Sequence, residues 1–200
     1  MSSPNCGRPR NALALIAVCA TLALSACAAH YVQVAPRMDL GPYGHVALVT
    51  FRGANADSGV AALATRRFAE SVLSGQGGIE VLELDAADTT LKALADRGVP
   101  AVFLGTLTLT DPHRSGHVSM SSVSVRETVS AELSVKLVST STGGTMWRSS
   151  ARTDGTLGRA SLAGLRPSVS IRDKDEAYGE VVDRLVATVT QDLRPTWVKE

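Results

Sequence analysis

The sequence predicts an α+β fold of mixed α/β character: a single mixed β-sheet built from a β-α-β-α-β segment, an antiparallel meander and a C-terminal helix. Three patterns predict it. Apolar runs alternate with segments of helical spacing over 45–109, apolar and polar residues alternate strictly over 129–137, and helical spacing returns over 173–193. A chain of 200 residues that is 44% hydrophobic has room for one domain core.

The predicted strands are of two kinds. Those of the first half are short, largely apolar runs, which is typical of buried strands, whereas 129–137 places one face in the core and one in water. The segment before it slips phase between Met120 and Val123, which predicts a bulge, and residues 142–144 predict a hairpin turn. The predicted strands are 45–51, 79–84, 101–109, 116–126, 129–137 and 145–149.

Helices are predicted over 57–74, 85–97 and 173–193. In the first and the last, apolar residues recur on one face and charged residues lie on the other, as in helices packed on a sheet. Asp173 and Glu176 have the spacing of a capping box, and Pro195 ends the last helix. Trp147 is predicted to close the core. For Trp197 two roles stay open: packing on the sheet or contacting a partner.

Charge and composition exclude several classes of protein. Charged residues make up 20% of the chain in both signs and the net charge is +1, so neither a disordered acidic chain nor a nucleic-acid binder is indicated. Three cysteines cannot form a closed disulfide framework, and their spacing fits no zinc site. We therefore expect no nucleic-acid partner, no metal and no cofactor.

The first residues have the pattern of a secretory signal peptide. Arg8 and Arg10, with no acid nearby, precede an almost wholly apolar run over 12–26. That run is shorter than the roughly 20 residues that span a bilayer as a helix. We therefore expect residues 1–26 to be removed, which lowers the net charge from +1 to −1 because the two arginines leave and no acid does.

Residues 24–27, Leu-Ser-Ala-Cys, resemble the lipobox of bacterial lipoproteins. The resemblance implies that a diacylglycerol is attached to the sulfur of Cys27, that the peptide before it is cleaved, and that the new amino terminus is acylated. With Ala28 rather than an aspartate after the cysteine, it also implies the outer membrane, with the domain facing the periplasm. Cys27 would be the one cysteine of the mature chain, so neither a disulfide nor thiol catalysis is expected.

Three parts of the chain follow from these patterns: a signal peptide over 1–26, a lipidated cysteine and tether over 27–44, and a single domain over 45–200. The tether is predicted because 28–44 contains prolines and glycines and has no sustained period.

The sequence contains no strong candidate for a metal ligand or a catalytic residue. His113 and His117 share a face of an extended segment near Asp111, but solvated loop histidines beside a turn at Ser115-Gly116 are a better interpretation than a metal site. The serines of 115–150 match no nucleophile pattern and are better explained as the solvent-exposed face of a strand. The carboxylates form no catalytic pair. We therefore expect no catalytic residue.

Two further features remain open. Residues 155–158 lack the lysine and glycines of a phosphate-binding loop and are predicted to be a connection. Five arginines are spaced regularly enough to consider an anionic partner such as a glycan or a lipid head, although isolated surface arginines are the commoner case. They are Arg148, Arg152, Arg159, Arg166 and Arg172.

Three pieces of the domain resemble one family of envelope proteins: the strand over 46–51, the strand after Val99-Pro100 with Gly105, and the strand-turn-strand over 137–147 that ends at Trp147. The family includes the curli secretion channel lipoprotein, the penicillin-binding-protein activator lipoproteins and the amino-terminal domain of the Tol-system propeller protein. The resemblance covers most of the mature chain and implies a non-enzymatic envelope role, either oligomer formation or binding of an assembly machine.

The sequence therefore predicts a lipid-anchored envelope lipoprotein that acts as an interaction, assembly or regulatory module at the outer membrane and is not an enzyme. Its partners would be the membrane, through the lipid, and either an envelope protein or further copies of itself. Two alternatives stay open: an envelope glycan-binding or hydrolytic lipoprotein, with the arginines or His113 and His117 at its site, and an oligomeric secretion-channel component.

Overall fold

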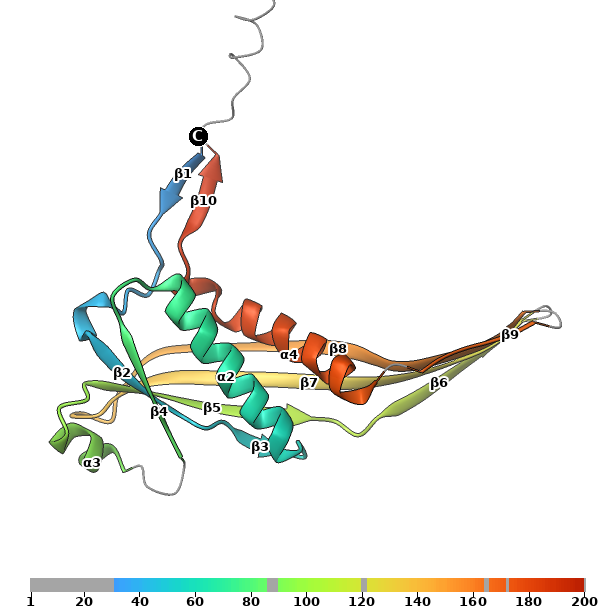
Figure 1. The fold of residues 1–200 in the computed structure, drawn as a ribbon, viewed down its shortest axis with the longest axis horizontal. Coiled ribbons are helices and arrows are strands. Elements are labelled where there is room, and N and C mark those ends of the chain that lie inside the picture. The colour runs from blue at the N-terminus through green and yellow to red at the C-terminus, as the bar shows by residue number, and fades with distance from the viewer. Residues whose placement is uncertain (1–30, 86–89, 120–121, 164–165, 172, 200) are drawn as a thin grey trace, which may run out of the picture. The chain divides into compact units, whose positions relative to one another are not determined.

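The computed structural model describes residues 31–85, 90–119, 122–163, 166–171 and 173–199. They fall into two units, a domain over 35–195 and a separate ribbon near the two ends of the chain. The domain confirms the predicted class, because the chain forms a mixed sheet with helices and a helix near its carboxyl end (Figure 1). The signal peptide and Cys27 lie outside the described residues.

The described strands of the domain form one eight-stranded sheet in the order β4-β2-β5-β7-β8-β9, with β3 beside β5 and β6 beside β7. The first half is parallel, since β2 pairs with β4 and β5, and β3 with β5; the second half is antiparallel. The strands are β2 (His45–Val49), β3 (Arg52–Ala54), β4 (Glu80–Leu84), β5 (Ala101–Leu109), β6 (His113–Val118), β7 (Ser122–Ser139), β8 (Thr145–Ala163) and β9 (Arg166–Ile171).

The helices begin at side chains that accept a hydrogen bond from the first turn, which satisfies backbone donors that the helix leaves free. Asp57 accepts from the Gly59 amide at 3.1 Å, and Asp173 from the Asp175 amide at 2.9 Å. The last helix is shorter than the predicted 173–193, because a 3₁₀ turn replaces its end. The helices are α2 (Ser58–Gly75), α3 (Leu91–Asp96) and α4 (Lys174–Val189), and the 3₁₀ turns are η1 (Gly41–Tyr43) and η3 (Gln191–Leu193).

The main core lies between one face of the sheet and the pair α2 and α4. Along its length runs a chain of edge-to-face aromatic contacts: Phe51 to Phe68 at 5.4 Å between ring centroids, Phe68 to Phe103 at 5.1 Å, and Phe103 to Trp147 at 6.1 Å. Such contacts stabilise a core beyond the area that they bury. The half-buried Trp147 packs against this core, as predicted.

The carboxamide of Gln76 joins the two ends of the domain. It accepts from the Leu40 amide at 3.0 Å and donates to the carbonyls of Met38 at 2.9 Å and Leu193 at 2.8 Å. Leu40 is fully buried. The packed domain therefore begins before His45, and the last residues of the predicted tether belong to it.

The middle of the chain differs from the prediction. Residues 113–118 of β6 pair antiparallel with 123–128 of β7, where one bulged strand was predicted, so Ser115-Gly116 lies within a strand and not in a turn. Met120 lies outside the described residues. The register of β7 against β8 shifts between Glu127 and Thr128, and again between Leu137 and Val138.

The predicted connection over 155–158 lies inside β8, and β9 follows where no strand was predicted. Gly155 marks the place where α4 crosses the sheet, because a Cβ there would overlap the side chain of Val181. The glycine therefore permits close helix-to-sheet packing instead of a turn.

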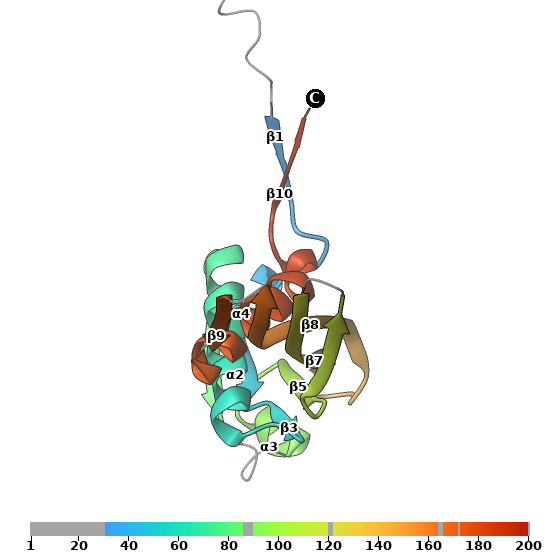
Figure 2. The ribbon, with the colours of Figure 1, turned by 90° about the vertical axis from the view of Figure 1, so that its right-hand side faces the viewer.

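Strands β6 and β9 and the adjoining parts of β7 and β8 extend past the helices as a sheet that we call the arm: residues 113–118, 122–128, 156–163 and 166–171 (Figure 1). Figure 2 looks along it, with β9, β8 and β7 side by side. The helical cover ends near the small cluster of Val129, Leu157 and Ala177.

The second unit contains an antiparallel ribbon of β1 (Tyr31–Val34) and β10 (Thr196–Lys199). Part of the predicted tether is thus a strand. Trp197 stands opposite Gln33 in this ribbon and is 65% exposed.

Gly105 gives a test of the core. A Cβ at this position would overlap the ring of Phe51, so we predict that Gly105→Ala lowers the free energy of unfolding by about 1–3 kcal/mol through overpacking. Gly116→Ala is the control, because its Cβ would meet nothing closer than the Ser124 carbonyl oxygen at 3.8 Å and should change stability by less than about 0.5 kcal/mol. Equal denaturant midpoints for the two variants would contradict this packing.

Candidate functional site

The two histidines considered for a metal site are on β6 and are exposed. They share a face, as predicted, but they are strand residues and not loop residues. Four residues along a strand separate their Cα atoms by about 13 Å, so His113 and His117 cannot bind one ion together. Across the described residues, no three histidine, cysteine, aspartate or glutamate side chains gather as metal ligands.

The serines of β7 and of the segment after β6 bond to neighbours other than histidine. The hydroxyl of Ser130 donates to a carboxylate oxygen of Asp154, and the hydroxyls of Ser119 and Ser122 bond to each other at 2.8 Å. Among the described residues, no hydrogen bond joins a serine to an imidazole, which is the contact that would activate a nucleophile.

The five arginines considered for an anionic partner do not form one line. Arg148 and Arg152 lie on the outer face of β8, Arg159 lies on the arm opposite Arg126, and Arg166 is in β9. Arg172 lies outside the described residues. The regular spacing in the sequence is therefore broken by the register shift and by the turn into β9.

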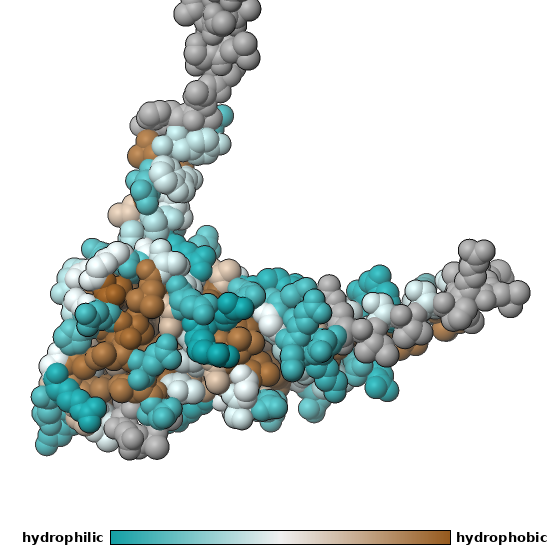
Figure 3. All heavy atoms as spheres, in the orientation of Figure 1, coloured by the Kyte–Doolittle hydropathy of each residue, from teal (hydrophilic) through white to brown (hydrophobic). Residues whose placement is uncertain are grey.

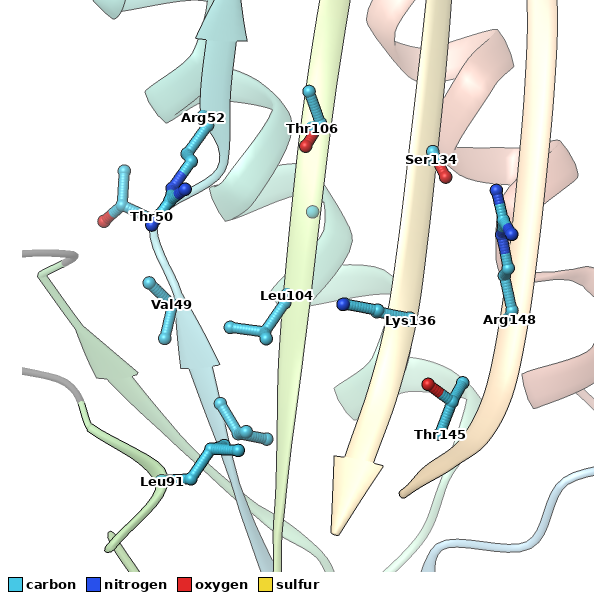
Figure 4. Close-up of a pocket in the computed structure, with 12 residues that line it drawn as sticks. Val49, Thr50, Arg52, Leu91, Leu104, Thr106, Ser134, Lys136, Thr145 and Arg148 are labelled. Carbon is cyan, nitrogen blue, oxygen red and sulfur yellow. The ribbon is translucent and has the colours of Figure 1, made fainter. Parts of the chain in front are cut away.

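The structure instead brings Arg148 near two cations that no sequence pattern groups with it. Arg52 of β3, Lys136 of β7 and Arg148 of β8 line a groove of about 560 Å³ on the face of the sheet opposite α2 and α4 (Figure 4). We call it the cationic groove. Their convergence depends on strand order and register, because β3 and β7 are both neighbours of β5.

The walls of the cationic groove combine hydroxyl groups with an apolar side. Figure 4 shows Lys136 extending toward Leu104, Arg148 running along β8 toward Ser134, and Arg52 extending toward Thr50. The hydroxyl-bearing residues are Thr50, Thr106, Ser134 and Thr145, and the apolar ones are Val49, Leu91, Val102 and Leu104. The groove therefore offers positive charge and hydrogen-bond donors above an aliphatic surface.

The charges of the groove are not balanced by the described residues. Lys136 and Arg148 are directly opposite each other in the β7–β8 register, and all three cations are exposed. None of them has a carboxylate within 4.0 Å in the described part of the chain. Asp85 stands at the rim, 3.5 Å from the hydroxyl of Thr50, and has an interaction of its own.

Some cations elsewhere form ion pairs. Arg67 of α2 contacts Glu70 at 3.1 Å and reaches across to Asp183 of α4 at 3.2 Å. The hydrogen bond that Arg67 donates to Glu70, together with the negative charges of Asp183 and Glu70, raises the pKa of the Arg67 guanidinium. On the arm, Arg114 contacts Glu127 at 3.4 Å. The cationic groove is thus different in kind from these surface ion pairs.

The arm has two faces of opposite character. Val118, Val123 and Val125 share one face and are 74%, 40% and 41% exposed. The other face carries serines, arginines and histidines. Figure 3 shows hydrophilic surface where α4 lies, beside hydrophobic patches of the domain. The face with the valines continues the side of β7 on which Val129 packs beneath α4, beyond the end of that helix.

No helix within the described residues is both long and apolar enough to cross a bilayer.

No protein-family model matches the sequence, and no curated protein matches it. Several solved structures are similar to the chain. A PelC dodecamer from Paraburkholderia phytofirmans is 16% identical with a TM-score of 0.46, and covers 82% of this chain and 96% of its own. Lipoprotein GNA1162 from Neisseria meningitidis is 18% identical with a TM-score of 0.40 over 70% of this chain and 93% of its own.

The C-terminal domain of LpoB from Salmonella enterica is also similar, at 13% identity and a TM-score of 0.34 over 66% of this chain and 90% of its own. The structural neighbours thus include lipoproteins of the bacterial envelope. At these identities and TM-scores the likeness assigns neither a family nor a function to this chain.

Proposed function

We propose that this chain is a lipid-anchored, non-enzymatic assembly module of the cell envelope, and that the arm is the surface through which copies of the chain associate. The observation that carries the proposal is the uncovered apolar face of the arm, with Val118, Val123 and Val125 exposed. Apolar residues gathered on a projecting sheet are typical of interaction surfaces in soluble proteins.

The edges of the arm support self-association. Strand β6 pairs only with β7 and β9 only with β8 among the described strands, so each presents a row of unpaired backbone donors and acceptors. An open edge is a template for pairing with a further strand. Because β6 and β9 are different edges, pairing β6 of one copy with β9 of the next would be a head-to-tail contact, which generates rings or filaments.

The anchor in the proposal is the lipidated thiol of Cys27. Each buried methylene of an acyl chain contributes about 0.8 kcal/mol, so two or three chains hold a protein stably at a membrane. The mature chain carries a net charge of −1 and offers no electrostatic attraction to acidic lipid heads. We place the domain at the outer membrane, facing the periplasm, on the lipobox and on Ala28 after it.

The non-enzymatic assignment belongs to the same proposal. Ser130 on the outer face of the sheet is bonded to Asp154 and not to a histidine, and His113 and His117 are too far apart to act on one group. An envelope hydrolase that used these residues would need their side chains to lie close together. A glycan-binding protein would instead use the cationic groove.

Val125→Lys tests the arm. A lysine buried between two copies would carry an uncompensated charge, which makes the free energy of association less favourable. Each 1.4 kcal/mol lost from that free energy weakens the association tenfold. We predict that the full-length chain in neutral detergent sediments as an oligomer and that Val125→Lys shifts it to the monomer. Leu82→Lys is the matched control, because Leu82 on the edge strand β4 is also 41% exposed. A monomeric parent chain, or equal dissociation in both variants, would contradict the proposal.

Cys27→Ser tests the anchor. The hydroxyl of serine cannot form the thioether, so this variant should incorporate no labelled fatty acid and should accumulate as the uncleaved precursor. Cys19→Ser is the control and should be processed normally, because that cysteine belongs to the segment that is removed. Normal maturation of the Cys27→Ser variant would overturn lipid anchoring.

A further inference from the structure

The cationic groove contains a charge arrangement that the fold itself does not require. Lys136 and Arg148 face each other directly across β7 and β8, and like charges in that position destabilise a sheet. Four residues along, the same face of the same strands has the opposite arrangement, because Arg152 stands opposite Glu132. The outer face therefore has one compensated pair and two uncompensated ones: Arg126 with Arg159 on the arm, and Lys136 with Arg148, which lines the groove together with Arg52.

The groove supplies what an anionic ligand needs. Lys136 and Arg148 are on neighbouring strands, about 4.8 Å apart, whereas Arg52 is two strands from Lys136 and two residues out of line with it, which separates their backbones by about 12 Å. Thr106 and Ser134 lie between these positions and carry hydroxyls that donate hydrogen bonds to oxyanions. The volume of about 560 Å³ is within the range of small-ligand sites.

We propose that the cationic groove binds a ligand that carries at least two oxyanion groups, phosphate or carboxylate. One group would lie between Lys136 and Arg148, where the planar guanidinium can bind two oxygens of the same anion, and a second would reach Arg52. The ligand would relieve the repulsion between the two facing cations. This site is on the opposite face of the sheet from α2 and α4 and does not depend on self-association through the arm.

The test is calorimetric titration of the full-length chain in neutral detergent with three probes: tripolyphosphate, trigalacturonate and the uncharged maltotriose. We expect binding of at least one of the charged probes and none of maltotriose. Which charged probe binds identifies the source, a phosphorylated or a carboxylated ligand. Raising the salt concentration from 0.05 to 0.5 M, values chosen for the experiment, should weaken binding several-fold, on the order expected for exposed charges.

Variants locate the site. The double variant Lys136→Gln, Arg148→Gln should lower the affinity at least about tenfold, whereas Arg152→Gln, on the same face of β8, should leave it within about twofold. Because the double variant removes a repulsive pair, its melting temperature should not fall, and that measurement separates lost binding from lost structure.

Failure of both charged probes to bind would overturn the proposal. Binding that weakens equally in Arg152→Gln would also overturn it, since the charge of the face as a whole, and not the groove, would then hold the ligand. A chain that fails to assemble through its arm but still binds tripolyphosphate or trigalacturonate leaves this inference standing.

Discussion

Strands β7 and β8 are longer than the helices packed on them, and the rest of the architecture depends on that mismatch. With 18 residues, β7 spans about 60 Å, whereas α2 with 18 residues and α4 with 16 span about 27 and 24 Å. The helices therefore cover only one half of the hairpin on one face. The other half becomes the arm, and the face opposite the helices holds the cationic groove.

The covered half is fixed by a few specific contacts. The aromatic chain from Phe51 to Trp147 fills the space beneath the helices, and Gly105 and Gly155 let the ring of Phe51 and the side chain of Val181 come close to the sheet. Gln76 then joins the beginning and the end of the domain through three hydrogen bonds. A rigid base of this kind is what a projecting arm requires, because a partner on the arm then acts on the whole domain.

Periodicity was sufficient to predict most of the elements that the core contacts. The strands over 45–51, 101–109 and 129–137 and the helices over 57–74 and 173–193 pack as their apolar residues predict. The strand over 79–84, predicted to be buried, is instead a largely exposed edge strand. The arm could not be predicted in this way, since the alternation of Ser124 and Val125 has no core on either side. Gly155 and Gly158 resemble a turn in the sequence, and only the approach of α4 shows why the first is a glycine within a strand.

The cationic groove was missed for a different reason. Arg52, Lys136 and Arg148 are far apart in the sequence, and their convergence follows from strand order and from a register shift at Leu137 that no local pattern encodes. The regular spacing of the arginines over 148–172 was misleading as a sign of one binding surface, because side chains along a strand with a bulge do not stay on one face. Local periodicity thus predicted the packed half of the molecule, and long-range pairing determined both candidate interaction surfaces.

Amide hydrogen exchange in the two edge strands of the arm tests the central claim most directly. The full-length lipidated chain in neutral detergent would be followed over a range of protein concentrations, with the edge strand β4 as the internal reference. If copies associate through the arm, amides of β6 and β9 become protected as the concentration rises while those of β4 do not. Fast exchange in β6 and β9 at every concentration, or protection that rises only in β4, would contradict the account.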